Sequence, residues 1–186
     1  YSGIQQNKLI FTDLQPSTDY SFRVRAVNKA GASDWTDLQA RTSVNPLEFA
    51  IQGITGTCSA ESQPGNGLNK LFDFDEQSMW HSHWDKKATP FEIIADLHSV
   101  NTLERMVYVP RQVGVNGMIT SATIATSMDK NHWVEAGSVQ WTRDMEKKTF
   151  TFSQQPQARY IRIKVDKAYG DFGSGQELYV FKMKGS

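Results

Sequence analysis

The stretch Tyr160–Ile161–Arg162–Ile163–Lys164–Val165 alternates bulky hydrophobic residues with charged ones. This period of two places the two kinds of side chain on opposite faces of an extended strand. Similar strand-like runs follow one another along the chain, separated by turn residues; they are Phe91–Leu97, Leu103–Pro110, Ile119–Ser127, Lys148–Ser153, Arg159–Val165 and Leu178–Lys184. No segment holds a helical hydrophobic stripe. Short strands at this spacing predict an all-β sandwich or barrel from Leu47 onward.

Composition narrows the class of protein. The chain has 186 residues, and its 20 Lys+Arg balance its 20 Asp+Glu. A balanced charge argues against a nucleic-acid binder, which usually has a basic surplus. No apolar run approaches the roughly 18 residues that a membrane span needs. The one cysteine, Cys58, has no partner for an internal disulfide, and no Cys/His cluster predicts a structural zinc site.

Residues 1–43 carry a separate pattern. Tyr20–Val27 alternates as a half-buried strand, and Leu38–Thr42 is a last short strand. Leu14–Tyr20, followed by Phe22–Asn28, resembles the end of a fibronectin type III domain, in which a tyrosine near the start of a strand bonds back to the backbone upstream. The resemblance covers about the last three strands of such a sandwich. We therefore expect an incomplete fibronectin domain at 1–43 and a second domain at 44–186.

The segment Lys70–Trp84 mixes acidic residues, a hydroxyl, two histidines and two tryptophans within fifteen positions. No helix or strand period explains this mixture, so it predicts a loop with a specific role. Its first half is typical of a metal-binding turn. Its second half is typical of the wall of a polar and aromatic pocket.

An ordered series of short motifs carries a second resemblance. The motifs are Asn69–Asp75, Trp80–Ser82, Ile94–Leu97, Tyr108–Gln112, Asn116–Gly117, Thr126–Asp129, Ala158–Ile163 and Gln176–Leu178. Together they resemble the discoidin or coagulation-factor type C fold, an eight-stranded jelly-roll, and within it the family 32 carbohydrate-binding modules. The resemblance covers about Leu47 to Lys184. A fibronectin domain followed by this module is similar to the accessory tail of a secreted bacterial glycoside hydrolase, so we expect the chain to be a piece of a longer protein.

The resemblance implies a structural calcium ion. Calcium takes six to eight oxygen ligands from carboxylates, carbonyls and hydroxyls. The implied ligands are Lys70, Asp73, Asp75, Ser78, Gln176 and Glu177. The sequence departs from the family at Phe74, where a glycine is usual; if this position needs φ > 0, phenylalanine adds strain of about 1 kcal/mol or more. From the pattern alone, a solvated acidic turn is the favoured explanation of these residues.

The resemblance also implies a sugar site. A sugar needs fixed polar donors around its hydroxyls and a flat aromatic surface for its C–H face. The implied residues are His81, Trp84, Arg111, Asn116 and Phe172, with Glu61 as a further acceptor. Taken alone, Arg111 is better explained as an ordinary surface arginine, and Phe172 is also explained as a side chain that fills space within its loop. Trp80, Trp133 and Trp141 are expected to pack in the sandwich. The implied ligand contains galactose, N-acetylgalactosamine or N-acetylglucosamine.

We predict a binding module without catalytic residues. Glycoside hydrolysis needs two carboxylates facing each other across a cleft, whereas Asp73, Asp75 and Glu177 are explained by metal or solvent. The expected partners are a glycan and a linked catalytic domain, in a secreted, periplasmic or cell-surface bacterial protein. One alternative is a protein- or phospholipid-binding discoidin adhesion domain. Another is a module that only spaces a neighbouring catalytic domain.

Overall fold

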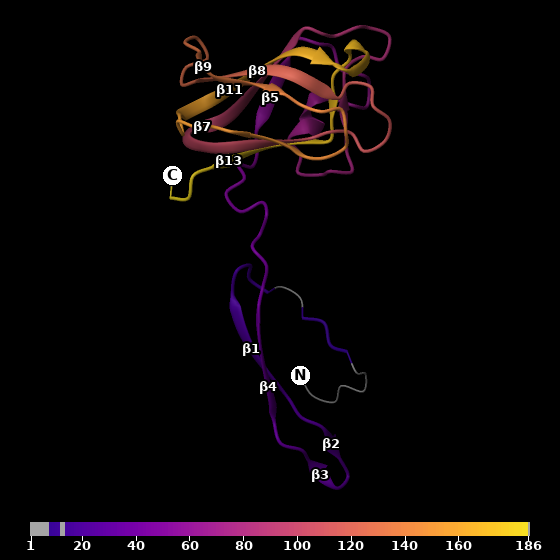
Figure 1. Ribbon diagram of the computed structural model, residues 1–186, viewed down its shortest axis with the longest axis vertical. Helices are drawn as coiled ribbons and strands as arrows, with labels where there is room; N and C mark the ends of the chain where they lie inside the picture. Colours follow the sequence, from indigo (N-terminus) through magenta and orange to yellow (C-terminus); the bar gives the residue numbers. More distant parts are fainter. Residues whose placement is uncertain (1–7, 12–13, 186) are drawn as a thin grey trace. The chain divides into compact units, whose positions relative to one another are not determined.

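The computed structural model describes residues 8–11 and 14–185 (Figure 1). The chain forms two compact units, Tyr1–Glu48 and Phe49–Ser186. The sequence-based division placed this junction between residues 43 and 44. Each unit is described by itself below.

The first unit consists of two antiparallel strand pairs. The pairs are β1 (Asp19–Val24) with β4 (Thr36–Arg41), and β2 (Val27–Asn28) with β3 (Gly31–Ala32). At the start of β1, the Tyr20 hydroxyl accepts a hydrogen bond from the backbone N–H of Gln15 at 2.8 Å. This is the upstream bond of the predicted tyrosine corner, which is thereby confirmed. It fixes the chain that enters β1 against the strand itself.

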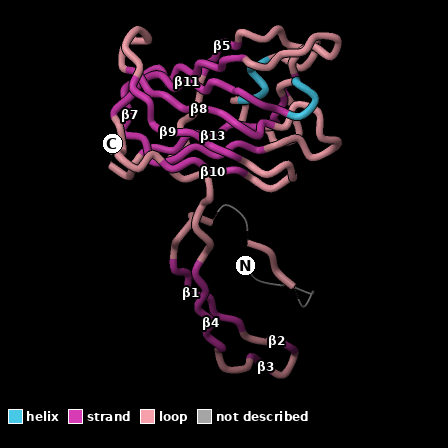
Figure 2. Tube along the Cα trace, turned by 45° about the horizontal axis from the view of Figure 1, so that its top comes forward, coloured by secondary structure: helices cyan, strands magenta, loops and turns pink. Residues whose placement is uncertain are grey.

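The second unit is the expected all-β sandwich. Its elements are β5 (Thr55–Cys58), η1 (Leu68–Leu71), β6 (Trp80–His81), β7 (Phe91–Val109), β8 (Ile119–Ser127), β9 (Val134–Gln140), β10 (Lys148–Thr151), β11 (Gln157–Ala168), η2 (Tyr169–Asp171), β12 (Ser174–Gly175) and β13 (Glu177–Lys182). The short turns η1 and η2 lie at the same end of the sandwich, drawn in cyan in Figure 2. In the described part of the chain, no helix is long and apolar enough to cross a membrane.

Strand β7 belongs to both layers of the sandwich. The sequence predicted two strands here, Phe91–Leu97 and Leu103–Pro110, but the structure has one strand of 19 residues. Its first half pairs with β5 and β11, and its second half pairs with β10 and β13. Between the halves, His98 adopts φ 61°, which bends the chain from one layer into the other. Counted as two strands, the halves bring the seven-stranded main sheet to the eight strands expected of the jelly-roll, and the short pair β6–β12 lies outside that sheet.

Four strands of the second unit were not predicted: the two-residue strands β6 and β12, and the longer strands β5 and β9. Strand β9 pairs with β8 and carries Glu135, Gly137 and Ser138, so its sequence lacks a hydrophobic alternation. Most of its side chains are exposed or half-buried because it lies at the end of the strand order. Strand β5 is only four residues long and starts Thr–Gly–Thr. Main-chain pairing with a neighbouring strand, rather than a hydrophobic face, holds both in place.

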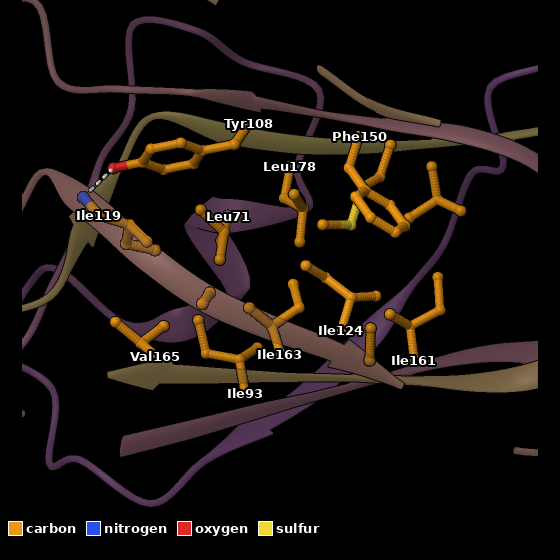
Figure 3. Packing of buried hydrophobic residues seen from close by; sticks show 14 of the residues in the cluster. Leu71, Ile93, Tyr108, Ile119, Ile124, Phe150, Ile161, Ile163, Val165 and Leu178 are labelled. Atoms are coloured by element: carbon orange, nitrogen blue, oxygen red, sulfur yellow. Dashed lines mark hydrogen bonds between the residues drawn. The ribbon is translucent and has the colours of Figure 1, made fainter. Parts of the chain in front are cut away.

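The core lies between the two layers (Figure 3). The inward faces contribute branched aliphatic and aromatic side chains, including Ile93, Ile161 and Ile163 from one layer and Leu103, Phe150 and Leu178 from the other. Trp80 is fully buried, as predicted, and its ring meets Phe91 edge-on at 5.8 Å. The alternation in Tyr160–Val165 is the inside–outside pattern of β11, the strand between β7 and β8.

Truncation of Ile161 tests this core. Ile161 is 1% exposed, so Ile161→Ala is expected to lower the free energy of unfolding by about 2–5 kcal/mol, because the lost methyl groups leave a cavity. Urea denaturation measures the change. Lys164→Thr, on the solvent side of the same strand, is the control and is expected to change stability by at most about 0.5 kcal/mol. Equal effects of the two changes would contradict the assigned orientation of β11.

Candidate functional site

Three distant segments meet at one end of the sandwich. Strand β6 pairs antiparallel with β12, which places His81 opposite Ser174. Next to this pair, Ser82 donates its backbone N–H to the Gly173 carbonyl at 2.8 Å, and its hydroxyl accepts from the Gly173 N–H at 2.9 Å. These bonds fix the loop after β6 against the turn after η2. The segment between β7 and β8 is the third partner.

Gly117 allows the segment between β7 and β8 to pack closely against the turn after η2. Its backbone has φ 84°, and a Cβ at this position would lie 2.7 Å from backbone atoms of Gly173 and Ser174. Only glycine fits such a contact without moving the backbone. The Gly117 N–H donates to the Tyr169 carbonyl at 2.8 Å, and its carbonyl accepts from the Ser174 N–H at 2.9 Å. The segment that carries Arg111 and Asn116 is therefore tied to the turn that carries Phe172.

A shallow cavity of about 230 Å³ lies where these segments meet. Its lining residues are Met79, His81, Trp84, Arg111, Asn116 and Phe172. Five of the six residues predicted for the sugar site are among them. The structure therefore brings together residues that lie up to 91 positions apart in the sequence, between His81 and Phe172.

His81 is buried and held in one tautomer. Its Nδ1 lies 2.6 Å from the Ser82 carbonyl, which only accepts, so Nδ1 carries the hydrogen and Nε2 is left as an acceptor in the neutral ring. Burial lowers the pKa of His81 below its usual 6.5, and the nearby charge of Arg111 lowers it further. Hydrogen bonds to the carbonyls of Ser82 and Asn116 raise the pKa, but by less than burial lowers it. At neutral pH the cavity therefore contains an uncharged imidazole.

The Arg111 side chain is fixed by hydrogen bonds to its own loop. Its Nε donates to the Val113 carbonyl at 2.6 Å, and its Nη1 donates to the Asn116 carbonyl at 3.0 Å. Within the described residues, Nη2 makes no hydrogen bond. The guanidinium therefore has a fixed orientation and keeps free N–H donors for a ligand. A lysine has a single flexible ammonium in place of this planar fork and would not reproduce both carbonyl bonds.

Two aromatic rings flank His81. The Phe172 ring centroid lies 5.9 Å from that of the imidazole, and the Trp84 centroid lies 6.4 Å from it at 87°. Trp84 is 57% exposed, which is unusual for so large a hydrophobic side chain. Rings at a cavity rim provide the flat apolar surface that a sugar C–H face requires. Together with the donors of Arg111, the cavity thus offers both kinds of contact that a sugar needs.

Two residues differ from the sequence-based set. Met79 lines the cavity but was not singled out; its position directly before the Trp80–His81 strand was the available signal. Glu61 does not line the cavity. Its carboxylate accepts from Lys86 Nζ at the surface, and its carbonyl accepts from the His83 N–H at 2.8 Å. An ion pair within this part of the structure therefore occupies the acceptor that we had assigned to the ligand.

The residues predicted to bind calcium form a second cluster. The Ser78 hydroxyl lies 2.8 Å from Asp73 Oδ2 and 3.3 Å from the Lys70 carbonyl. The Asp75 carbonyl accepts from the Ser78 N–H at 2.9 Å. Among the described residues, no group of three or more His, Cys, Asp and Glu side chains is placed to hold a metal ion. A cage here would rely on backbone carbonyl oxygens as well as carboxylates, as the sequence-based ligand set assumes.

Phe74 adopts the left-handed conformation that its position requires. Its φ is 61°, a region that phenylalanine rarely occupies and glycine occupies freely. The strained residue packs its ring edge-on against Tyr179, with centroids 5.3 Å apart. The turn thus has a shape that a glycine would adopt freely, at a cost of order 1–3 kcal/mol that the ring contact offsets in part.

Two buried oxygens beside this turn have no partner. Glu177 is fully buried; its Oε1 accepts from the Leu178 N–H at 2.9 Å, whereas Oε2 has no hydrogen bond in the described structure. The side-chain Oε1 of Gln176 is likewise unpaired. Burial, with the charges of Asp73 and Glu76, raises the pKa of Glu177 to about 7. Unsatisfied buried oxygens next to acidic side chains and carbonyls fit the donor set of a calcium ion.

Comparison with known families agrees with this architecture. The F5/8 type C domain family model matches residues 55–178, and the fibronectin type III domain model matches residues 2–39, which is part of such a domain. The family 32 carbohydrate-binding module of Clostridium perfringens NanJ, solved in complex with galactose, superposes with a TM-score of 0.67 at 25% identity. That match covers 72% of this chain and 98% of the module.

Two curated relatives are enzymes. The A type blood N-acetyl-α-D-galactosamine deacetylase of Flavonifractor plautii is 29% identical over 166 residues, which cover 87% of this chain and 21% of that protein. The galactose oxidase of Gibberella zeae is 30% identical over 147 residues, which cover 74% of this chain and 21% of that protein. This chain therefore spans about a fifth of the length of either relative.

The burial of His81 leads to a direct test by NMR. In a titration of the histidine rings, His81 is expected to have a pKa below 6.5 because burial disfavours its cation. His132 serves as an internal control: its hydrogen bond to Asp129 raises its pKa above 6.5. A titration in which His81 protonates at a higher pH than His132 would contradict the described environment of the cavity.

Proposed function

The chain belongs to the F5/8 type C domain family, and we propose that its second unit is a non-catalytic carbohydrate-binding module for a galactose-type or N-acetylhexosamine sugar. The observation that carries this proposal is the cavity in which His81, Arg111 and Asn116 lie beside Trp84 and Phe172. The galactose-bound family 32 module of NanJ supports the same ligand class. Which of the related sugars binds depends on contacts to one hydroxyl or one acetamide group.

The chemistry of the cavity fits a neutral, hydroxyl-rich ring. Arg111 donates with a fixed orientation, neutral His81 accepts through Nε2, and Asn116 carries an amide that both donates and accepts. Such a set distinguishes sugars by the direction of their hydroxyl groups, because each buried polar partner must be satisfied. The exposed indole of Trp84 covers the apolar face of the ring.

The expected affinity is weak, and weak affinity suggests a tethering role. A monosaccharide has about a dozen heavy atoms, and roughly 0.3–0.5 kcal/mol per atom corresponds to a dissociation constant from about 1 mM down to tens of micromolar. Such binding keeps a linked catalytic domain close to the glycan and so raises the local concentration of its substrate. We propose that the parent protein is a secreted or cell-surface bacterial enzyme, with a glycoside hydrolase as the first candidate. Both curated relatives are enzymes, which supports the proposal of a linked catalytic domain.

A second candidate is a phospholipid-binding discoidin domain. It is favoured by the exposure of two apolar side chains on the loops around the cavity, Val113 at 80% and Trp84 at 57%. Exposed apolar loop tips are able to enter the interfacial region of a bilayer. Sedimentation with anionic liposomes separates the two candidates: pelleting of the protein supports the lipid function, and its absence together with galactoside binding supports the carbohydrate function.

Arg111→Ala tests the carbohydrate function. The change removes a charge-assisted donor worth about 1.5–3 kcal/mol, which weakens galactoside binding by roughly ten- to a hundredfold. Arg111→Lys is expected to bind almost as poorly, because the ammonium cannot hold both loop carbonyls. Isothermal titration with galactose and N-acetylgalactosamine measures the effect, with melting temperature as the control for folding. A variant that binds as tightly as the wild type would remove Arg111 from the site.

We also propose that a structural calcium ion is held by Asp73, Asp75, Ser78, Glu177 and the carbonyl groups of Lys70 and Gln176. The buried Oε2 of Glu177, which has no hydrogen bond in the described structure and lies near the charges of Asp73 and Glu76, supports this proposal. An ion there would join the beginning of the second unit to its last strand, a closure of about 100 residues in which the entropic gain is large.

Calcium is expected to raise the melting temperature, since a ligand at about 100 times its dissociation constant stabilises the native state by about 2.7 kcal/mol. A chelator should reverse the effect. Glu177→Gln should remove the response to calcium, whereas Glu135→Gln on the exposed face of β9 should keep it. Thermal melts with and without calcium measure both. A wild-type protein that melts at the same temperature in chelator and in calcium would favour the solvated-turn interpretation.

A further inference from the structure

A second guanidinium is stacked on the residue that begins the η2 turn. Arg143, in the loop between β9 and β10, is stacked over the ring of Tyr169, with its Cζ 4.4 Å from the ring centroid. Tyr169 is 39% exposed, and it immediately precedes Gly170. A Cβ on Gly170 would lie 3.1 Å from the Phe172 ring and 3.4 Å from Asn116 Oδ1. Arg143 therefore rests on the residue before Gly170, and it is Gly170 that lies against two lining residues of the cavity.

The loop that carries Arg143 is firmly held. Trp141 stacks on Tyr108 at 5.6 Å and 13°, and its N–H donates to the Thr120 carbonyl at 2.8 Å. The Met145 carbonyl accepts from Gln112 Nε2 at 3.0 Å, which ties the loop to the segment next to Arg111. These contacts lie on both sides of Arg143 in the sequence. Its guanidinium is thus presented by an anchored loop and oriented by an aromatic ring.

Arg143 has no acidic partner within the described residues. Several lysines of the same unit do: Lys86 pairs with Glu61, Lys87 with Asp171 at 2.7 Å, and Lys147 with Glu76 at 2.6 Å. In the loop of Arg143 itself, Asp144 pairs with Lys148, and Glu146 makes no ion pair with Arg143. Arg111 binds only carbonyl oxygens. In the described structure, Arg111 in the cavity and Arg143 on Tyr169 are therefore guanidinium groups that no carboxylate neutralises.

We propose that Arg143 binds an oxyanion, a sulfate ester or a carboxylate, on the sugar unit next to the one held in the cavity. This inference rests on the proposed carbohydrate function and specifies its ligand class as an acidic oligosaccharide. A planar guanidinium matches two oxygens of either anion, and stacking on Tyr169 reduces the conformational freedom that binding would otherwise remove. The cavity itself holds about one sugar, so a neighbouring unit must lie outside it, over its rim.

The test uses three disaccharides with the same terminal galactose. The second sugar is N-acetylglucosamine, its 6-sulfate, or glucuronate, and affinities are measured by isothermal titration at low and high ionic strength. The sulfated and glucuronate compounds are expected to bind about two- to fivefold more tightly than the neutral one at low ionic strength, the size of an exposed ion pair. The difference should shrink in high salt, which screens exposed charges. The two acidic compounds also separate sulfate from carboxylate as the preferred anion.

Arg143→Gln is expected to abolish the preference while leaving the affinity for the neutral disaccharide unchanged. Arg162→Gln is the matched control, because Arg162 is stacked in the same way, 4.7 Å from the Trp133 ring, and Trp133 lies outside the η2 segment that leads to Phe172. Equal affinity for neutral and acidic compounds, or a preference that persists in Arg143→Gln, would overturn the inference and leave the sugar site intact. Failure of all three disaccharides to bind would overturn the galactoside site together with it.

Discussion

The buried hydroxyl of Tyr108 is the interaction on which the cavity depends. It donates to the Ser174 carbonyl at 2.6 Å. It also accepts from the Ile119 N–H at 3.3 Å, the bond drawn in Figure 3. It therefore joins the end of β7, the start of β8 and the short strand β12. Arg111 directly follows the first of these, Asn116 precedes the second, and His81 pairs with the third. Without this junction, the loops would not share a common position.

Around this junction, the molecule uses glycine and paired backbone groups where side chains would not fit. A Cβ on Gly175 would lie 2.7 Å from the Tyr108 ring, and one on Gly173 would lie 2.6 Å from Trp80. The close backbone packing leaves no room for regular long strands at this end, so β6 and β12 are two residues each. The polar side chains of the cavity consequently lie on short segments that are held mainly by hydrogen bonds to one another. This arrangement orients His81 and Arg111 before any ligand arrives, which reduces the entropic cost of binding.

Much of the fold was predictable from local patterns. The alternation of Tyr160–Val165 gave β11, and Ile119–Ser127 gave β8. Strand β9 was not predictable because an edge strand needs no hydrophobic face, and the continuity of β7 depends on one backbone angle at His98. For the site, the family resemblance named five of the six lining residues. Residue patterns alone did not separate a role in ligand binding from an ordinary role in a loop or at the surface. Met79 and the ion pair of Glu61 with Lys86 depend on tertiary contacts that no spacing in the sequence shows.

The central claim is that one sugar ring occupies the cavity beside His81. The most direct measurement is a crystal structure of the chain soaked with galactose or N-acetylgalactosamine. The account predicts electron density for the ring in the cavity, with hydroxyl groups within hydrogen-bond distance of Arg111 and His81 and with the C–H face against Trp84. A sugar bound at another surface of the molecule, with this cavity filled only by water, would contradict it.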